Sequence, residues 1–246
     1  MDLDGLALPV LTQARRQVLA ALAAASSRPD ALAVLGVGPS LQDEVDRNTR
    51  WSTEPAVPVQ HLYSGVLYDA LDLASLGPGA KRRARSRLLV ISAAWGALRV
   101  DDAVPAYRLS MSTTLTGLAT PDDDGSALTM ASFWRPHLTL ALPPLALGVI
   151  VDCRSSAYAA AWRPAGPQAV RTVAIRVLRE THGRRSVVSH MAKHTRGLVA
   201  RHLVSRAGRD PGSPQALAAA LGEAFCVELG GPARDGSRVL DVIVRE

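Results

Sequence analysis

The feature that most constrains the fold is a strand-turn-strand-helix pattern between residues 170 and 205. From Val170 to Leu178, Val and Ala alternate with Arg, Thr and Ile, a period of two that is typical of a β-strand. The dipeptide His182-Gly183 then suits a tight turn, and a second strand runs through Val188. We therefore predict a β-hairpin, followed by a helix over residues 191–205.

The remaining elements are predicted in the same way. Helices are expected over residues 11–25, 40–50, 62–73, from 81, over part of 134–147 and over 214–224, and strands over 88–91, 107–113, 148–152, 225–229 and 238–244. The helix at 40–50 begins with Ser40-Leu41-Gln42-Asp43, which has the spacing of a capping box with Asp in place of Glu. Helices first, then mixed strands and helices, predict an α+β fold with a mixed β-sheet and flanking helices, as a single domain over 1–246.

Composition narrows the class of protein. The 246 residues are 48% hydrophobic and 20% charged, which is typical of a globular chain that buries a core. Cys153 and Cys226 lie far apart, with no CxxC and no Cys/His spacing of a metal site, so we expect a reduced, cytoplasmic protein. No apolar run is long enough for a membrane span, and the N-terminus has no signal-peptide pattern.

Positive charge is concentrated in the second part of the chain. The formal net charge is +6, yet residues 1–80 hold five Arg and nine acids. Residues 163–209 hold eleven Lys and Arg and one acid, Glu180. Such a segment favours polyanionic partners, either nucleic acid or nucleotides and phosphorylated metabolites. A generally Arg-rich composition without functional meaning is the alternative.

The first candidate site is the stretch from Gly77 to Arg87. The two glycines allow a tight turn, and five of the seven residues 81–87 are basic. After the helix at 62–73, the layout looks like a helix-hairpin-helix over about residues 61–87, a module that contacts the DNA backbone, although Pro78 stands where an aliphatic residue is usual. The alternative is a solvated loop and helix start. The DNA-binding residues predicted from this layout are Gly77, Gly79, Lys81, Arg82, Arg83 and Arg85.

Two further candidates follow predicted buried strands, where α/β proteins often bind ligands. Arg99 and Arg108 could clamp a phosphate or carboxylate, although Arg99 pairing with a neighbouring aspartate is the alternative. Ser155 is near the start of a helix after the strand at 148–152, as an anion contact or as a simple helix cap. No G-x-S-x-G surrounds it, so a hydrolase nucleophile is not indicated.

The fourth candidate is the start of the helix at 191–205. His190 and His194 are four residues apart, but H-M-A-K-H lacks the Glu of H-E-x-x-H and has no evident third ligand. We therefore predict no metal site and name no cofactor. Lys193 and Arg196 share a helix face and can bind one anion.

Taken in order, these segments resemble the peroxide stress protein YaaA family. Tyr63-Ser64-Gly65-Val66-Leu67-Tyr68 matches its Y-S/T-G-x-x-Y element, and Trp95-Gly96-Ala97-Leu98-Arg99 with Pro105-Ala106-Tyr107-Arg108-Leu109 matches its G-x-L-R and P-x-Y-R-L block. The other matching elements are Phe133-Trp134, Arg154-Ser155-Ser156-Ala157-Tyr158 and Ala192-Lys193-His194-Thr195-Arg196-Gly197.

The resemblance implies a cytosolic protein of oxidative-stress defence that binds DNA without base readout and limits iron-driven damage. Family members begin with a strand that carries a lysine motif. Met1-Asp2-Leu3-Asp4 does not match it, so the sheet is expected to expose an edge, whether the start is a truncation or a property of this member.

The second hypothesis is an enzyme acting on a nucleotide or other anionic small molecule in a basic cleft, with no reaction named; a scaffold protein is a third possibility. The cleft residues predicted are Tyr63, Ser64, Arg99, Tyr107, Arg108, Arg154, Ser155, Tyr158, Lys193 and Arg196.

Overall fold

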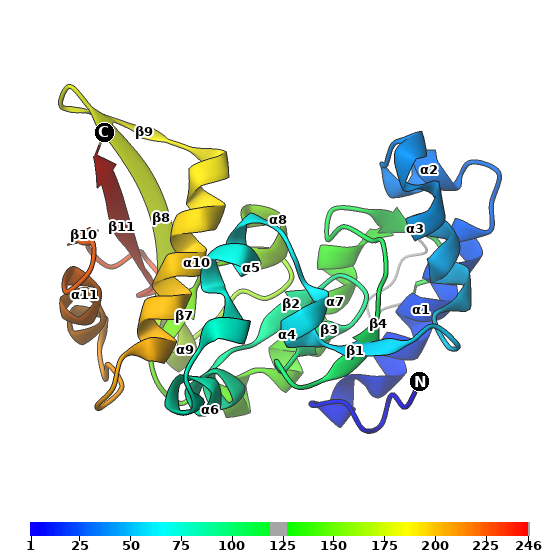
Figure 1. Ribbon diagram of the computed structural model, residues 1–246, viewed down its shortest axis with the longest axis horizontal. Coiled ribbons are helices and arrows are strands. Elements are labelled where there is room, and N and C mark those ends of the chain that lie inside the picture. Colours follow the sequence, from blue (N-terminus) through cyan, green and yellow to red (C-terminus); the bar gives the residue numbers. More distant parts are fainter. Residues whose placement is uncertain (119–126, 246) are drawn as a thin grey trace. The chain divides into compact units, whose positions relative to one another are not determined.

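The computed structural model describes residues 1–118 and 127–245, and it divides into two compact units (Figure 1). Unit 1 comprises Met1–Leu62, Leu88–Leu142 and Arg154–Arg163, and unit 2 comprises Tyr63–Arg87, Pro143–Cys153 and Pro164–Glu246. The chain thus passes between the units several times. The single domain expected from the sequence stays a prediction.

Unit 1 consists of helices and short two-stranded pieces of sheet. Its helices are α1 (Thr12–Ser26), α2 (Ala31–Leu35), α3 (Gln42–Arg47), α4 (Val59–Leu62), α7 (Met130–Ala141) and α8 (Ser156–Ala159), with 3-10 turns at Pro9–Leu11, Pro39–Leu41 and Asn48–Arg50. The antiparallel pairs are β1 (Ala56–Pro58) with β4 (Ala103–Pro105), β2 (Val90–Ser92) with β3 (Gly96–Leu98), and β5 (Thr114–Leu115) with β6 (Leu128–Thr129).

The core of unit 1 is built around two buried tryptophans. Trp95 and Trp134 are both fully buried, and the Trp134 indole Nε1 donates to the Ala93 carbonyl at 2.7 Å. Gly96 has φ +74°, and a Cβ there would lie 2.7 Å from the Trp134 ring. Only glycine therefore permits both the turn between β2 and β3 and the close approach of α7.

Arg15, on α1, is a fully buried charge in unit 1. Its Nε donates to the Trp95 carbonyl at 3.1 Å, and its Nη2 donates to the carbonyls of Ala97 and Ala7 at 2.9 and 2.8 Å. Burial lowers its pKa to about 10, so the guanidinium stays protonated at neutral pH. These bonds join α1 to the β2–β3 hairpin.

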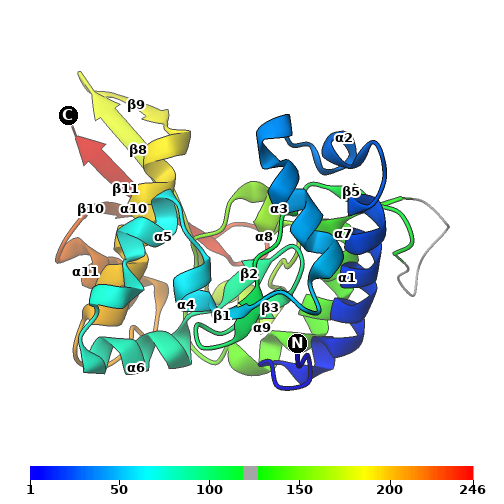
Figure 2. The same cartoon turned by 45° about the vertical axis from the view of Figure 1, so that its right-hand side comes forward.

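Unit 2 is organised around one mixed sheet, as predicted (Figure 2). The strand order is β10 (Cys226–Leu229), β11 (Arg238–Arg245), β8 (Thr172–Thr181) and β7 (Ile150–Asp152), with β9 (Arg184–Val187) also paired to β8. Strands β7, β8 and β11 are parallel to one another, while β9 and β10 run antiparallel to their neighbours. His182 and Gly183 both have positive φ, at 49° and 72°, as a two-residue hairpin turn requires.

Helices cover one face of this sheet. Helix α10 (Ser189–Ser205) lies along β8 and beside α5 (Val66–Leu71), and α11 (Pro214–Gly222) packs next to β10 (Figure 1). The 3-10 turn Leu73–Ser75, α6 (Pro78–Arg87), the 3-10 turn Pro143–Leu145 and α9 (Pro167–Val170) complete the unit. Val173, Ile175 and Val177 of β8 point into the core beneath α10 and α11, which confirms the alternation seen in the sequence.

Several local expectations were wrong. The helix predicted over 62–73 is interrupted between Leu62 and Val66, because Gly65 has φ +97°. No strand covers 107–113, and the apolar run 88–91 contributes only its end to the three-residue β2. Helix α3 begins at Gln42 after Leu41, without a side-chain cap, so the predicted capping box is absent.

Candidate functional site

Helix α6 presents two different faces. Ala80 and Ala84 are buried, and on the same side the Arg83 Nε and Nη2 donate to the carbonyls of Val204 and Ser205 at 2.7 and 2.9 Å. Arg87 forms an ion pair with Asp210 at 2.7 Å. Arg83 therefore binds the last carbonyls of α10, which is the favourable place for a cation at a helix end.

The other face of α6 carries Lys81, Arg82 and Arg85. At 100° per residue these positions fall within an arc of about 100°. Arg82 and Arg85 are exposed, and Lys81 is half-buried. Within the described ranges, the side chains of Lys81 and Arg82 have no hydrogen bond or ion pair to another residue, and the helix itself contains no acid. This outward face is a compact cluster of positive charge.

The helix-hairpin-helix is not confirmed. Gly79 lies inside α6, and neither Gly77 nor Gly79 has a positive φ, so no glycine hairpin precedes the helix. Gly77 instead accepts the Lys81 N–H at 2.9 Å as the helix begins. The basic helix start was located correctly, whereas the turn before it was not.

The family element in α10, from Ala192 to Gly197, makes mostly contacts that hold the helix in place within unit 2. Arg196 donates from Nε to the Ile175 carbonyl at 3.0 Å, and Thr195 is buried. At Gly197, a Cβ would lie 2.2 Å from the Leu67 carbonyl oxygen of α5. Only Lys193 and His194 of this stretch are exposed. The His190 side chain lies outside the described residues.

The first two of the predicted cleft residues belong to the loop before α5. Tyr63 stacks on Tyr68 with ring centroids 5.2 Å apart, and Ser64 is exposed beside Gly65. The Tyr63–Tyr68 pair thus stabilises the segment that interrupts the predicted helix.

A cluster of hydroxyl groups lies in unit 1. The Ser92 and Tyr107 hydroxyls are 2.8 Å apart, and Ser92 also accepts the Trp95 N–H at 3.1 Å. Burial, assisted by the nearby Tyr107, raises the pKa of Tyr158 to about 12, against the opposing effect of Arg108. Tyr158 is therefore a neutral donor at physiological pH.

The predicted arginines of unit 1 make contacts of their own. Arg108 pairs with Glu44 at 3.4 Å. Arg154 donates to the Trp162 carbonyl at 2.9 Å and lies over the Trp162 ring at 5.5 Å. The backbone N–H of Arg99 donates to the Asp102 carboxylate at 2.8 Å. Ser155 precedes α8 without a side-chain cap bond.

The predicted cleft residues divide between the two units, and their convergence stays a prediction. Unit 1 contains Arg99, Tyr107, Arg108, Arg154, Ser155 and Tyr158, whereas unit 2 contains Tyr63, Ser64, Lys193 and Arg196.

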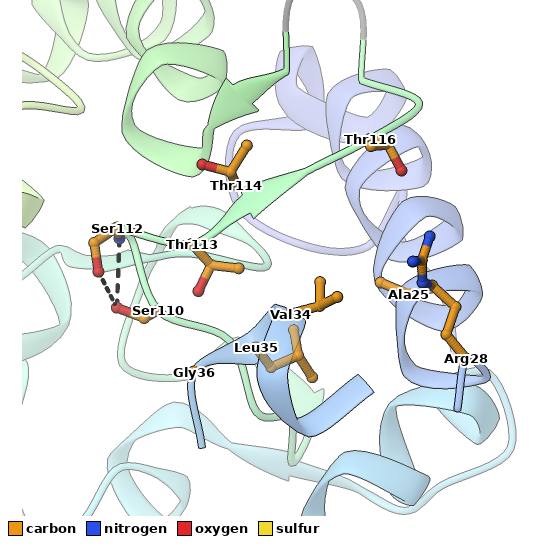
Figure 3. Close-up of a pocket in the computed structure, with 10 residues that line it drawn as sticks. All are labelled: Ala25, Arg28, Val34, Leu35, Gly36, Ser110, Ser112, Thr113, Thr114 and Thr116. Atoms are coloured by element: carbon orange, nitrogen blue, oxygen red, sulfur yellow. Dashed lines mark hydrogen bonds between the residues drawn. The ribbon is translucent and has the colours of Figure 1, made fainter. Parts of the chain in front are cut away.

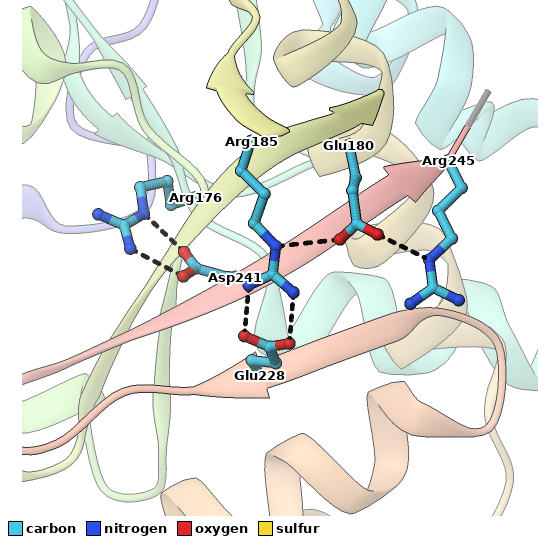
Figure 4. Close-up of polar contacts among 6 residues, drawn as sticks. All are labelled: Arg176, Glu180, Arg185, Glu228, Asp241 and Arg245. Atoms are coloured by element: carbon cyan, nitrogen blue, oxygen red, sulfur yellow. Dashed lines mark hydrogen bonds and ion pairs between the residues drawn. The ribbon is translucent and has the colours of Figure 1, made fainter. Parts of the chain in front are cut away.

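Two arginines of the acid-poor segment, Arg176 and Arg185, are neutralised by carboxylates from elsewhere in the chain. Arg176 makes a bidentate pair with Asp241 at 2.6 and 2.7 Å, and Arg185 makes one with Glu228 at 2.7 Å for both contacts (Figure 4). Glu180 contacts Arg185 at 3.0 Å and Arg245 at 3.6 Å. These pairs lie on the sheet face opposite α10, and they raise the pKa values of Arg176 and Arg185.

Neither thiol groups nor metal ligands form a site in the described part of the chain. Cys226 is exposed, while burial raises the pKa of the half-buried Cys153 to about 12, so Cys153 is a thiol at neutral pH. No group of three or more His, Cys, Asp or Glu residues among those described could hold a metal ion. Likewise, none of the described helices is long and apolar enough to cross a membrane.

A cavity in unit 1 was not predicted from the sequence. It has a volume of about 560 Å³ and is lined on one side by hydroxyl side chains (Figure 3). In the run Ser110-Met111-Ser112-Thr113-Thr114-Leu115-Thr116, five of the seven residues carry a hydroxyl group, a signal that could have indicated a polar surface. The hydroxyl residues lining the cavity are Ser110, Ser112, Thr113, Thr114 and Thr116.

The comparisons with known proteins all point to the same family. Residues 4–226 match the family model described as peroxide stress protein YaaA. The chain is 44% identical to a UPF0246 protein of Streptomyces coelicolor, over 98% of this chain and 90% of that protein. It is 37% identical to a UPF0246 protein of Corynebacterium efficiens, over 83% of this chain and 78% of that protein. The resemblance seen in the sequence is confirmed: the chain belongs to the peroxide stress protein YaaA family.

Proposed function

We propose that this protein acts in the peroxide stress response by binding DNA without sequence preference, through Lys81, Arg82 and Arg85 of α6. The observation that carries the proposal is the division of α6 into a face bound to α10 and an outward basic face. Phosphate contacts need closely spaced cations and no base readout. Arg83 is assigned a positioning role, because its guanidinium already binds two carbonyls of α10.

The test is a titration of fluorescent duplex DNA at several salt concentrations. Affinity is expected to fall steeply with salt, and to be equal for duplexes of unrelated sequence. Replacing Lys81, Arg82 and Arg85 by Glu should weaken binding about 100-fold or more and reduce the salt slope by about three, one for each lost phosphate contact.

A matched control removes general charge effects. Arg47, Arg163 and Arg234 are exposed, and replacing all three by Glu changes the net charge by the same amount. This control should bind DNA with nearly the wild-type salt slope. Equal losses in the two triple variants would contradict the assignment to α6.

A second candidate function is the binding of an anionic small molecule near Tyr107 and Tyr158. The Ser92–Tyr107 contact and the proximity of Arg108 to Tyr158 favour it, because a neutral phenol beside a guanidinium can donate to an anion. Titration calorimetry with AMP should detect binding that Tyr107→Phe weakens and Arg47→Gln does not. Equal affinities in the three proteins would contradict this function.

A further inference from the structure

The hydroxyl cavity, defined by Ser110, Ser112, Thr113, Thr114 and Thr116, contains a threonine hydroxyl that no side chain or carbonyl of the described residues bonds. Thr113 is 8% exposed; its N–H donates to the Ser110 carbonyl at 3.1 Å and its carbonyl accepts from Met130 at 2.8 Å. Its hydroxyl makes no hydrogen bond to any residue in the described ranges. The Thr113 hydroxyl is therefore available to bond a ligand hydroxyl in the cavity.

The other hydroxyls leave capacity for a ligand as well. Ser110 and Ser112 bond each other at 2.9 Å, but each hydroxyl oxygen has a further lone pair. Thr114 and Thr116 have no side-chain hydrogen bond within the described ranges. Figure 3 shows the Thr113 hydroxyl pointing toward the segment with Leu35 and Gly36.

The opposite wall of the cavity is apolar apart from Arg28. Ala25, Val34 and Leu35 provide carbon surface, and a Cβ at Gly36 would meet nothing within 4 Å. Arg28 is paired with Asp30 through two bonds of 2.7 and 2.8 Å. Because Asp30 neutralises the charge of Arg28, the cavity has little attraction for a charged ligand, and its hydroxyl groups offer both donors and acceptors.

We propose that the hydroxyl cavity binds a neutral, polyhydroxylated ring, either a free sugar or the ribose of a nucleoside. Ring hydroxyls would bond Thr113 and Arg28, while the C–H face of the ring packs on Val34 and Leu35. The volume of about 560 Å³ lies in the range of small-molecule sites. This binding is independent of α6 and of DNA.

The experiment is titration calorimetry with ribose and with adenosine, on the intact protein. Saturable binding with a Kd at or below about 1 mM is expected for at least one of the two, and adenosine alone would identify the nucleoside as the source. Unlike DNA binding, the affinity should not depend on salt, because the ligand is neutral.

Thr113→Val keeps the shape of the side chain and removes one hydrogen bond, so it should weaken binding about fivefold. Thr139→Val is the matched control on an exposed part of α7 and should change nothing. Unfolding midpoints of both variants establish that they fold. The Lys81, Arg82 and Arg85 triple variant and Tyr107→Phe should bind the ring normally.

Absence of saturable binding at about 10 mM ligand would overturn the proposal. So would equal affinities in Thr113→Val and Thr139→Val, or loss of binding in the α6 triple variant with Thr113→Val unaffected. None of these outcomes bears on DNA binding, which has its own triple variants.

Discussion

Two basic regions of this protein look alike in the sequence and differ in the structure. Residues 81–87 and residues 163–209 are both rich in Arg and poor in acids. In the second region, the register of β11 against β8 places Asp241 opposite Arg176, and β10 brings Glu228 to Arg185. In α6, Lys81 and Arg82 meet no carboxylate in the described residues. Counting charged residues along the sequence therefore overstates the positive potential of a region wherever another strand places carboxylates next to it.

The largest effect is expected for a change at Gly197, which tests whether the family element in α10 serves to pack this helix against α5. Gly197→Ala would place a Cβ 2.2 Å from the Leu67 carbonyl and 2.8 Å from the Ala70 Cβ, so α5 and α10 must separate. We expect a loss of about 2–4 kcal/mol in the free energy of unfolding, measured by urea denaturation. Gly208→Ala, at φ +100° with nothing within 4 Å, tests backbone strain without a clash. A smaller loss at Gly197 than at Gly208 would contradict the packing argument.

The second prediction compares the two regions directly. The double variant Lys81→Gln with Arg82→Gln should weaken DNA binding about 30-fold, since both cations are available to phosphate. Arg176→Gln with Arg185→Gln removes the same charge but from neutralised pairs, and should change the affinity by less than about threefold. Fluorescence anisotropy at one fixed salt concentration measures both. A reversed order would break the distinction between the regions.

The third prediction separates the two faces of α6. Arg83→Met keeps the apolar stem and removes the bonds to Val204 and Ser205, so the unfolding free energy should fall by about 1–1.5 kcal/mol. Arg82→Met, on the outward face, should leave stability unchanged and weaken DNA binding. If the unfolding free energy falls equally in Arg83→Met and Arg82→Met, the bonds of Arg83 to α10 do not contribute to stability.

The smallest effect concerns the sheet network and pH. The bonds from Arg185 hold the pKa of Glu228 below its ordinary value of 4.5. Stability from this pair is present above pH 4.5 and is lost as the pH falls through the lowered value. Glu228→Gln should therefore reduce the Tm at pH 7 and have almost no effect near about pH 2. An equal difference at both pH values would show that the charge of Glu228 is not responsible.

Much of unit 2 could be predicted from the sequence, because its strands alternate and its hairpin contains His182-Gly183. Unit 1 was harder, since its strands have only two or three residues and carry little periodicity. The break at Gly65 was missed because an apolar face continues on both sides of it. The outward face of α6 followed from its Lys and Arg residues, but the bonds of Arg83, Arg154 and Arg196 to carbonyls depend on tertiary contacts that no local pattern encodes.

Arg15 has a consequence for the folding of unit 1. Its bonds reach the Trp95 and Ala97 carbonyls, 80 and 82 residues away along the chain. Until the β2–β3 hairpin is in place, docking α1 would bury a charge that has only the carbonyls of Ala7 and Leu8 as acceptors, so neither element gains fully by forming first. Such a contact makes folding slow relative to local helix formation and makes the opening of α1 and the hairpin one cooperative event. Their amide hydrogens should exchange with solvent at matching free energies, as a single folding unit.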